Sequence, residues 1–412
     1  MMRLAIITSG YLPVPASKGG AVENLAENFI KENEKKEYLD ITVFSIYEEK
    51  ARERANKYRK TNTIFIKTPK IIKAFDRIIY FCAKNILKKE KTMSYRYICQ
   101  RLHYLNNVSK YLKKNEYDKV LIENHATLFL ALKWRKNYKK YEGKYYYHLH
   151  NEITNDFGCI EIIKQSKKII CVSNYIVNQT KKRLELNNSQ DKFDVLKNCI
   201  DENEFINKIS KNKIDELRNK YSINKNDKVL LFTGRLTREK GIRELLLAIR
   251  NVKTNNFKLL IVGSFFFDTN IKNEFECELS SIIKDIKEKV IFTGFISYED
   301  IPNIYKLADI AVLPSIWDDP APLTIIEALK SGLPIITTFS GGIPEYVSKE
   351  CSIILDKNDN DKLVKELSKN IEILLVDENK IKGMSRKSVE ISKNLTLENY
   401  YMNFLKKIEL KG

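Results

Sequence analysis

The chain has 412 residues, a length typical of two domains that each bury a core of their own. No apolar run reaches the roughly 18 residues that a membrane-spanning helix needs, and the seven cysteines are scattered without a CxxC pair. Composition therefore argues against a membrane-spanning protein and against a disulfide framework, and it favours a reducing cytoplasm. The formal net charge of +19 indicates a polyanionic partner or an anionic surface.

The positive charge gathers between residues 50 and 114, where 19 Lys and Arg stand against three acids and supply +16 of the net charge. Within this segment, the stretch 71–87 carries apolar residues on one helical stripe, with Lys and Arg largely elsewhere around the helix. Such a helix either packs on a core or lies in a membrane interface, and the surrounding charge favours the interface. We expect residues 50–114 to meet an anionic membrane surface. No nucleic-acid partner is expected, because no nucleic-acid-binding motif is present.

The chain opens with a predicted strand, Arg3–Thr8, and a loop that ends in Gly19 and Gly20 before a helical pattern over residues 20–30. Glycines at a helix N-terminus let a phosphate or an acceptor approach the backbone closely, so both are candidate binding residues. Further strands of the first half are predicted at Asp40–Ser45, Lys119–Ile122, Lys144–Leu149, Lys168–Val172 and Phe193–Leu196.

The alternation of strands and helices restarts in the second half of the chain. Its strands are predicted at Lys228–Thr233, Phe257–Val262, Val290–Thr293, Asp309–Pro314, Pro334–Thr338 and Ser352–Leu355, with tail helices at Asp361–Leu375 and Glu398–Ile408. Such alternation predicts parallel sheets with right-handed crossovers. We therefore expect an α/β protein with two Rossmann-like, doubly wound domains, residues 1–198 and 199–390, that face each other across a deep cleft. Residues 391–412 are expected to form a helix that crosses back to the first domain.

Polar residues and glycines collect directly after the predicted strands. They are Gly10, His125, His150, Gly234, Arg235, Gly263, Ser264, Gly294 and Asp319. Open α/β sheets bind ligands at the carboxyl ends of their strands. The sequence therefore predicts a single site to which both halves contribute.

The stretch Pro314–Pro334 holds two carboxylates, Asp319 and Glu327, eight residues apart. A helix that begins near Pro322 offers unpaired backbone N–H groups and a partial positive charge to an anion. A carboxylate on either side of that anion can bind hydroxyls, which suits a sugar joined to a nucleoside diphosphate. The alternative is a strand–loop–helix corner with two solvated acids.

Five stretches of the second half resemble motifs of the family 4 retaining glycosyltransferases (glycosyl transferases group 1), of the bacterial cell-surface polysaccharide type. They are Gly234–Gly241, Phe292–Ile296, Ala308–Ser315, the pair Asp319 and Glu327, and Gly341–Glu345. This family has the GT-B fold, in agreement with the two doubly wound domains expected from the pattern. The resemblance implies a transferase that moves a sugar from a nucleotide-sugar donor to an acceptor hydroxyl with retention of configuration.

The resemblance also assigns roles to residues. Arg235 and Lys240 would neutralise the diphosphate, Glu327 would hold the ribose and Asp319 the donor sugar. Other residues expected to border the donor are Gly19, Gly20, Gly234, Gly263, Ser264, Phe295, Ile296, Pro322, Leu323 and Thr324.

In the first domain, the resemblance points to His150, which follows the strand Lys144–Leu149, as the histidine that faces the reacting sugar. His148 stands on the same strand face and remains an alternative. Glu123 and His125 follow the neighbouring strand and are expected on the acceptor side.

Two residues depart from the family pattern. Asp319 stands where the family usually has Glu, and Asn198 is followed by Cys199 rather than by Gly. No metal-ligating motif follows a suitable strand, so we expect neither a metal nor a cofactor, and the nucleotide-sugar is a co-substrate. A UDP-sugar is the favoured donor, and a lipid-linked glycan at the inner face of the cell membrane is the expected acceptor. A nucleotide-sugar epimerase on the same fold, or an inactive nucleotide-sugar-binding module, are the alternatives.

Overall fold

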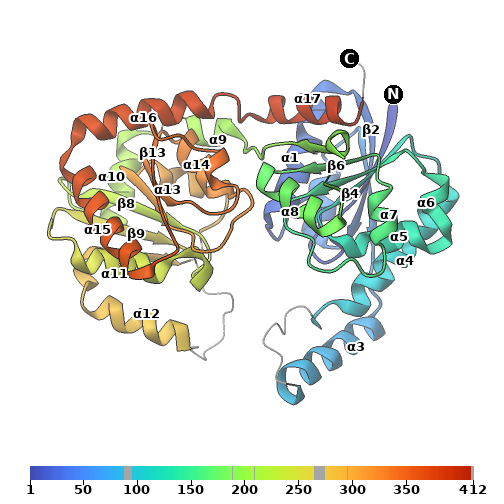
Figure 1. Ribbon diagram of the computed structural model, residues 1–412, viewed down its shortest axis with the longest axis horizontal. Coiled ribbons are helices and arrows are strands. Elements are labelled where there is room, and N and C mark those ends of the chain that lie inside the picture. The colour runs from blue at the N-terminus through green and yellow to red at the C-terminus, as the bar shows by residue number, and fades with distance from the viewer. Residues whose placement is uncertain (88–94, 188, 208, 264–273, 295, 410–412) are drawn as a thin grey trace. The chain divides into compact units, whose positions relative to one another are not determined.

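A computed structural model describes residues 1–87, 95–187, 189–207, 209–263, 274–294 and 296–409. The chain divides into two units (Figure 1). Unit 1 comprises Met1–Lys197 together with Leu397–Gly412, and unit 2 comprises Asn198–Thr396. Within the described residues, no helix is both long enough and apolar enough to cross a membrane.

Unit 1 is built on a seven-stranded sheet in the order β3-β2-β1-β4-β5-β6-β7. Its strands, all paired in parallel, are β1 (Met2–Ile7), β2 (Leu39–Ile46), β3 (Thr61–Ile66), β4 (Lys119–Glu123), β5 (Tyr145–Leu149), β6 (Lys168–Cys171) and β7 (Phe193–Val195). Strand β5 is buried along its whole length, as expected where helices cover both faces of a parallel sheet. The strand order reverses between β1 and β4, which leaves a crevice for ligands at their carboxyl ends.

The helices of unit 1 include a segment from the far end of the chain. They are α1 (Ala21–Lys36), α2 (Glu49–Ala55), α3 (Lys70–Phe81), α4 (Ile98–Lys114), α5 (Leu130–Lys133), α6 (Asn137–Lys140), α7 (Ile160–Lys164), α8 (Asn174–Leu184) and α17 (Leu397–Lys407). Helix α17 packs on α1, where the ring of Phe29 lies 4.7 Å from that of Phe404 (Figure 1). The last helix thus completes the core of the first unit.

Unit 2 is built on a six-stranded parallel sheet in the order β10-β9-β8-β11-β12-β13. Its strands are β8 (Lys228–Thr233), β9 (Phe257–Val262), β10 (Val290–Gly294), β11 (Ile310–Leu313), β12 (Ile335–Thr338) and β13 (Ser352–Leu355). The order reverses between β8 and β11, so the ligand crevice of this sheet is expected beyond Thr233 and Leu313.

Helices cover both faces of this second sheet (Figure 1). One group contains α11 (Ile242–Asn251), α12 (Glu274–Lys284) and α15 (Asn360–Val376), and α11 contacts both of the others. The other contains α9 (Glu202–Ile206), α13 (Ile301–Tyr305), α14 (Leu323–Lys330) and α16 (Glu378–Ser392), while α10 (Lys211–Lys220) precedes β8. Two doubly wound parallel sheets confirm the predicted α/β fold class. The sequence pattern missed β3 and α16.

Helix α3 leaves its apolar stripe in solvent. Ile71, Phe75 and Ile78 are 70%, 56% and 57% exposed, so the stripe does not pack on the core of unit 1. The attachment of α3 is polar instead: the buried Asp76 carboxylate accepts the backbone N–H groups of Cys99 and Gln100 at the start of α4. The apolar face therefore remains available for another surface.

Candidate functional site

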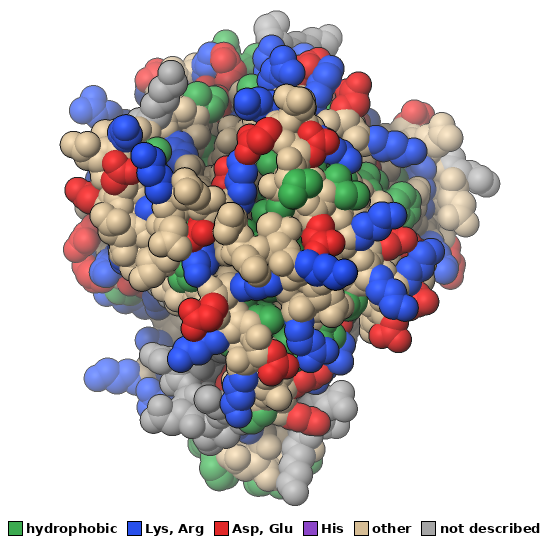
Figure 2. All heavy atoms as spheres, turned by 90° about the vertical axis from the view of Figure 1, so that its left-hand side faces the viewer, with side chains coloured by type: hydrophobic (Ala, Val, Ile, Leu, Met, Phe, Trp, Pro, Cys, Tyr) green, Lys and Arg blue, Asp and Glu red, His purple; other side chains and the backbone are tan. Residues whose placement is uncertain are grey.

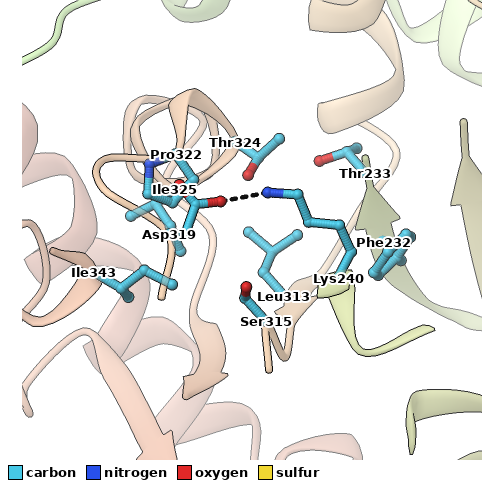
Figure 3. A pocket seen from close by; sticks show the side chains of 10 residues that line it. All are labelled: Phe232, Thr233, Lys240, Leu313, Ser315, Asp319, Pro322, Thr324, Ile325 and Ile343. Carbon is cyan, nitrogen blue, oxygen red and sulfur yellow. Dashed lines mark hydrogen bonds and ion pairs between the residues drawn. The ribbon is translucent and has the colours of Figure 1, made fainter. Parts of the chain in front are cut away.

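A pocket lies at the reversal point of the unit 2 sheet (Figure 3). It is lined by Phe232, Thr233, Lys240, Leu313, Ser315, Asp319, Pro322, Thr324, Ile325 and Ile343. The enclosed space measures about 20 Å³, which is roughly the room that one water molecule needs.

An ion pair between Lys240 and Asp319 crosses this pocket (Figure 3). Lys240 ends the short 3-10 helix Arg238–Lys240 after β8, and Asp319 lies in the loop after β11. Their side chains are only 20% and 9% exposed, so each charge neutralises the other in a largely dry position. The fold thus brings together two residues that lie 79 positions apart in the sequence.

A glycine turn holds the Asp319 loop in place. The N–H of Gly342 donates to the Asp319 carbonyl at 2.9 Å, and the N–H of Gly341 donates to the Asp318 carboxylate at 2.9 Å. Gly341 has φ +51°, and a Cβ there would stand 2.4 Å from the Asp319 carbonyl oxygen. Only glycine fits this turn, which fastens the carboxylate of Asp318 to the loop and leaves that of Asp319 to the pocket.

Helix α14 begins at the wall of the pocket. Pro322 precedes the helix and has no side chain that caps it, so the N–H groups of the first turn keep no side-chain partner at that position. Thr324 and Ile325 of this turn line the pocket. The helix dipole and the N–H groups favour an anion there.

Glu327 lies one turn further into α14 and is buried. Its carboxylate accepts a hydrogen bond from the Tyr305 hydroxyl at 2.8 Å, and that hydroxyl also lies 2.7 Å from the Thr233 hydroxyl. Burial raises the pKa of Glu327 to about 7, although the Tyr305 hydrogen bond opposes the rise. Because Thr233 lines the pocket, a hydrogen-bonded chain connects Glu327 to it. Tyr305 and Thr233 are not among the site residues predicted from the sequence. Each is a single polar group at the end of a largely apolar helix or strand, which is a weak sign of function.

The other predicted donor residues that the structure describes in unit 2 do not line the pocket. Arg235 is exposed beyond Gly234, and it does not line the pocket. Gly263 follows β9 and lies so close to Gly234 that a Cβ on it would meet the Gly234 carbonyl oxygen at 2.0 Å. Ile296 is half-buried. Ser264 and Phe295 lie outside the described residues.

In unit 1, Gly19 faces open space at the start of α1, whereas the space beside Gly20 is filled. The Glu23 carboxylate lies where a Gly20 Cβ would point, at 2.3 Å, and accepts the Ser9 hydroxyl at 2.8 Å. The backbone at Gly20 therefore faces an acid of its own helix. The sequence pattern did not anticipate this, because Glu23 looks like an ordinary first-turn residue.

A second polar cluster lies at the carboxyl ends of β4 and β5. One carboxylate oxygen of Glu123 lies 3.1 Å from His148 Nδ1 and 3.2 Å from His150 Nε2, and all three side chains are buried. The backbone N–H of His150 donates to the side chain of Asn124 at 3.1 Å. The fold brings both candidate histidines to one acid, and His125 lies beside them.

The acid of this cluster is charged. Burial alone would raise the pKa of Glu123, but the charge and hydrogen bonds of His148 and His150 lower it to about 2. Burial lowers the pKa of His150 to about 4, so its ring is neutral at physiological pH. The three side chains offer ligand atoms within 4.8 Å of one another, the spacing that a metal site would need. His148 Nδ1 and His150 Nε2 lie at hydrogen-bond distance from Glu123, whereas the buried His148 Nε2 has no partner.

Known proteins resemble this chain in sequence. Residues 213–388 match the family Glycosyl transferases group 1. Spore coat protein SA of Bacillus subtilis (strain 168) is 26% identical over 84% of this chain and 84% of its own length. The UDP-Gal:alpha-D-GlcNAc-diphosphoundecaprenol alpha-1,3-galactosyltransferase of Escherichia coli is 28% identical over 43% of this chain and 44% of its own.

Solved structures agree with the fold along the whole chain. A glycosyltransferase from Rickettsia africae ESF-5 has a TM-score of 0.74 and 18% identity, over 99% of this chain and 98% of that one. Anabaena Alr3699/HepE in complex with UDP and glucose has a TM-score of 0.71 and 16% identity, over 99% of both chains. The fold is therefore GT-B, and residues 213–388, which lie in unit 2, match the group 1 glycosyltransferases in sequence.

The first prediction concerns Glu327→Gln. The raised pKa of Glu327 stabilises the fold at acid pH, and this contribution is lost as the pH rises through about 7. Gln stays neutral, so the variant should be more stable than the natural protein at about pH 8, by up to about 3 kcal/mol, and by little at about pH 5. Thermal unfolding across this pH range measures the difference. The exposed Glu288→Gln serves as control, and an equal gain at both pH values contradicts the account.

The second prediction concerns Glu123→Leu. This change leaves two buried imidazoles without their shared acceptor, at roughly 1–3 kcal/mol each. Urea unfolding should show a loss of about 3 kcal/mol, and Glu123→Gln should lose less because its amide oxygen still accepts. The exposed Glu142→Leu should change stability by less than about 0.5 kcal/mol. Equal losses at positions 123 and 142 would show that the cluster does not stabilise unit 1.

Proposed function

We propose that the protein transfers a sugar, with retention, from a nucleotide-sugar to a hydroxyl of a lipid-linked glycan in bacterial polysaccharide biosynthesis. The observation that carries this proposal is the Lys240–Asp319 ion pair, which crosses a pocket beside the uncapped start of α14. A cation, a carboxylate and helix N–H groups are the partners that a sugar diphosphate requires.

On donor binding, the ion pair between Lys240 and Asp319 would give way to two separate interactions with the ligand. Lys240 would turn to the diphosphate and Asp319 to the hydroxyls of the sugar, while the N–H groups around Leu323 and Thr324 hold the remaining oxygens. In the absence of donor, the ion pair avoids the cost of leaving either charge buried alone. Asp319 is one methylene shorter than the Glu usual in the family, and the turn at Gly341 and Gly342 fixes the loop that carries it.

The ribose of the donor is assigned to Glu327. Ionised carboxylates accept two hydroxyl hydrogen bonds, but a carboxyl with a pKa of about 7 is only partly ionised at neutral pH. The Tyr305 hydroxyl already donates to one of its oxygens and lowers its pKa. The hydroxyls of a ribose would stabilise the ionised form further, so Glu327 binds the donor more tightly as the pH rises.

For the chemical step we propose attack on the same face from which the leaving group departs. The bond between the anomeric carbon and the diphosphate oxygen breaks, and the acceptor oxygen bonds to that carbon. The acceptor proton passes to the departing phosphate oxygen. Arg235, Lys240 and the start of α14 stabilise the developing negative charge, which is the task that a metal ion performs elsewhere. His150 would donate or accept a hydrogen bond at the reacting sugar.

A UDP-sugar is the proposed donor and a lipid-linked glycan the proposed acceptor. Support comes from the Anabaena structure, which contains UDP and glucose, and from the Escherichia coli relative, whose name specifies UDP-Gal and a diphosphoundecaprenol acceptor. The Anabaena protein shares the fold of this chain, and the Escherichia coli relative is 28% identical over 43% of it. A capsule, a lipopolysaccharide or an exopolysaccharide is the product class proposed.

We also place the protein at the inner face of the membrane, attached through α3. The apolar stripe of this helix is exposed, and Lys73, Arg77 and Lys84 flank it. On the face drawn in Figure 2, by contrast, Lys and Arg are mixed with Asp and Glu. An apolar stripe with a basic surround binds anionic lipid surfaces.

The third prediction concerns metal. Because Lys240 and α14 carry the diphosphate charge, EDTA should leave sugar transfer unchanged. Lys240→Met should lower kcat at least tenfold, as expected from the loss of one charge-assisted hydrogen bond worth about 1.5–3 kcal/mol. A radiolabelled sugar-transfer assay measures both. Loss of turnover in EDTA, with recovery in Mg²⁺ or Mn²⁺, would refute metal independence.

The fourth prediction concerns membranes. The full chain should sediment with vesicles of phosphatidylglycerol and phosphatidylcholine at low salt, and less at high salt. Phe75→Ser with Ile78→Ser should weaken binding more than tenfold, because each apolar side chain contributes about 1.5–3 kcal/mol. Phe339→Ser with Val376→Ser, which removes exposed apolar residues of unit 2, should not. Equal loss in both double variants would exclude α3 as the attachment.

A further inference from the structure

Arg101 is a cation without an acidic partner at the ligand edge of unit 1. It lies in the first turn of α4, with its guanidinium carbon 5.0 Å above the Tyr11 ring. One terminal N–H donates to the Thr127 hydroxyl at 3.4 Å, a long contact, and the buried Nε has no partner. Among the described residues, no carboxylate lies within the 4.0 Å of an ion pair with Arg101. A guanidinium in this condition retains most of its hydrogen-bonding capacity.

Three elements fix the position of Arg101. Gly10 precedes Tyr11 after β1, and its carbonyl accepts the Gln100 side chain at 3.2 Å. A Cβ on Gly10 would stand 2.6 Å from the Tyr104 ring, so this loop lies directly on α4. On the other side, the His125 ring meets the Tyr11 ring edge-on at 5.6 Å. The loops after β1 and β4 thus hold Arg101 at the reversal point of the sheet, where ligands bind.

The surroundings of Arg101 do not compensate its charge. Burial lowers the pKa of Arg101, and burial together with the Arg101 charge lowers that of His125 to about 4, so His125 is neutral. The buried acids near this edge have other partners. Glu23 accepts the Ser9 hydroxyl, Glu123 binds the two histidines, and Asp76 accepts the backbone N–H groups at the start of α4. A partly buried cation without an acid is costly to the fold. Its planar fork matches the paired oxygens of a phosphate or a carboxylate.

We propose that Arg101, with Tyr11, His125 and Thr127 around it, binds an acidic group of the acceptor substrate through two anionic oxygens. The acceptor of this protein is therefore an acidic molecule, and Arg101 distinguishes it from neutral glycans. The inference rests on the proposed glycosyltransferase function, and it names the chemical class of the acceptor. The acidic group is either a phosphate of the acceptor's linkage or a carboxylate of an acidic sugar.

Calorimetric titration of the full chain, saturated with UDP so that the donor pocket is filled, tests the proposal. Inorganic pyrophosphate and glucuronate serve as probes of the two sources. The natural protein should bind one of them at least tenfold more tightly than Arg101→Gln, as expected for a lost charge-assisted pair. Arg101→Lys, which keeps the charge but loses the fork, should fall between them.

Arg3→Gln is the matched control, because Arg3 also stacks on a tyrosine, Tyr117, but is exposed at the opposite end of β1. It should bind the probe like the natural protein. Equal binding by Arg101→Gln and Arg3→Gln, or no binding of either probe to the natural protein, would overturn the proposal. A separate titration of each protein with UDP, before the probes are added, reports the donor site, so a failure of the proposed function would show as no UDP signal in the natural protein and in every variant.

Discussion

The ion pair between Lys240 and Asp319 is the interaction on which the donor site depends. Each partner is largely buried, so neither can stay charged at low cost unless it meets the other or a ligand. The strand order brings Lys240 and Asp319 together, because β8 and β11 are neighbours and the loops that follow them lie side by side where the sheet order reverses. The pair keeps the pocket folded and ready for a group that carries both a negative charge and hydroxyls.

Both sheets place charged residues at the carboxyl ends of their strands, but the residues differ between the two units. In unit 2 the sheet edge presents Lys240, Asp319 and the start of α14, which suits a sugar diphosphate. In unit 1 the corresponding edge presents Glu123 with its two histidines, and beside them Arg101 without an acid. In unit 2, a ligand must therefore break an existing ion pair to bind. In unit 1, a ligand would supply the acidic partner that Arg101 lacks.

The fold was predictable because short apolar runs, bounded by glycines and polar residues and alternating with helical patterns, indicate the strands of a parallel sheet. Strand β3, Thr61–Ile66, was missed because its polar alternation and basic surroundings hide an edge strand. The positions of Asp319 and Lys240 followed from motif spacing. The contacts of Tyr305, Arg101 and Glu23 did not, because each depends on a partner brought near only by the packing of distant elements.

The central claim is that the pocket at Lys240 and Asp319 binds the nucleotide-sugar donor. Thermal unfolding without metal, against UDP-, GDP-, ADP- and dTDP-sugars, tests it most directly. At 100 times its dissociation constant, a UDP-sugar should stabilise the natural protein by about 2.7 kcal/mol and should stabilise Asp319→Ala far less. No stabilisation by any of the four, or equal stabilisation of the natural protein and Asp319→Ala, would contradict the account.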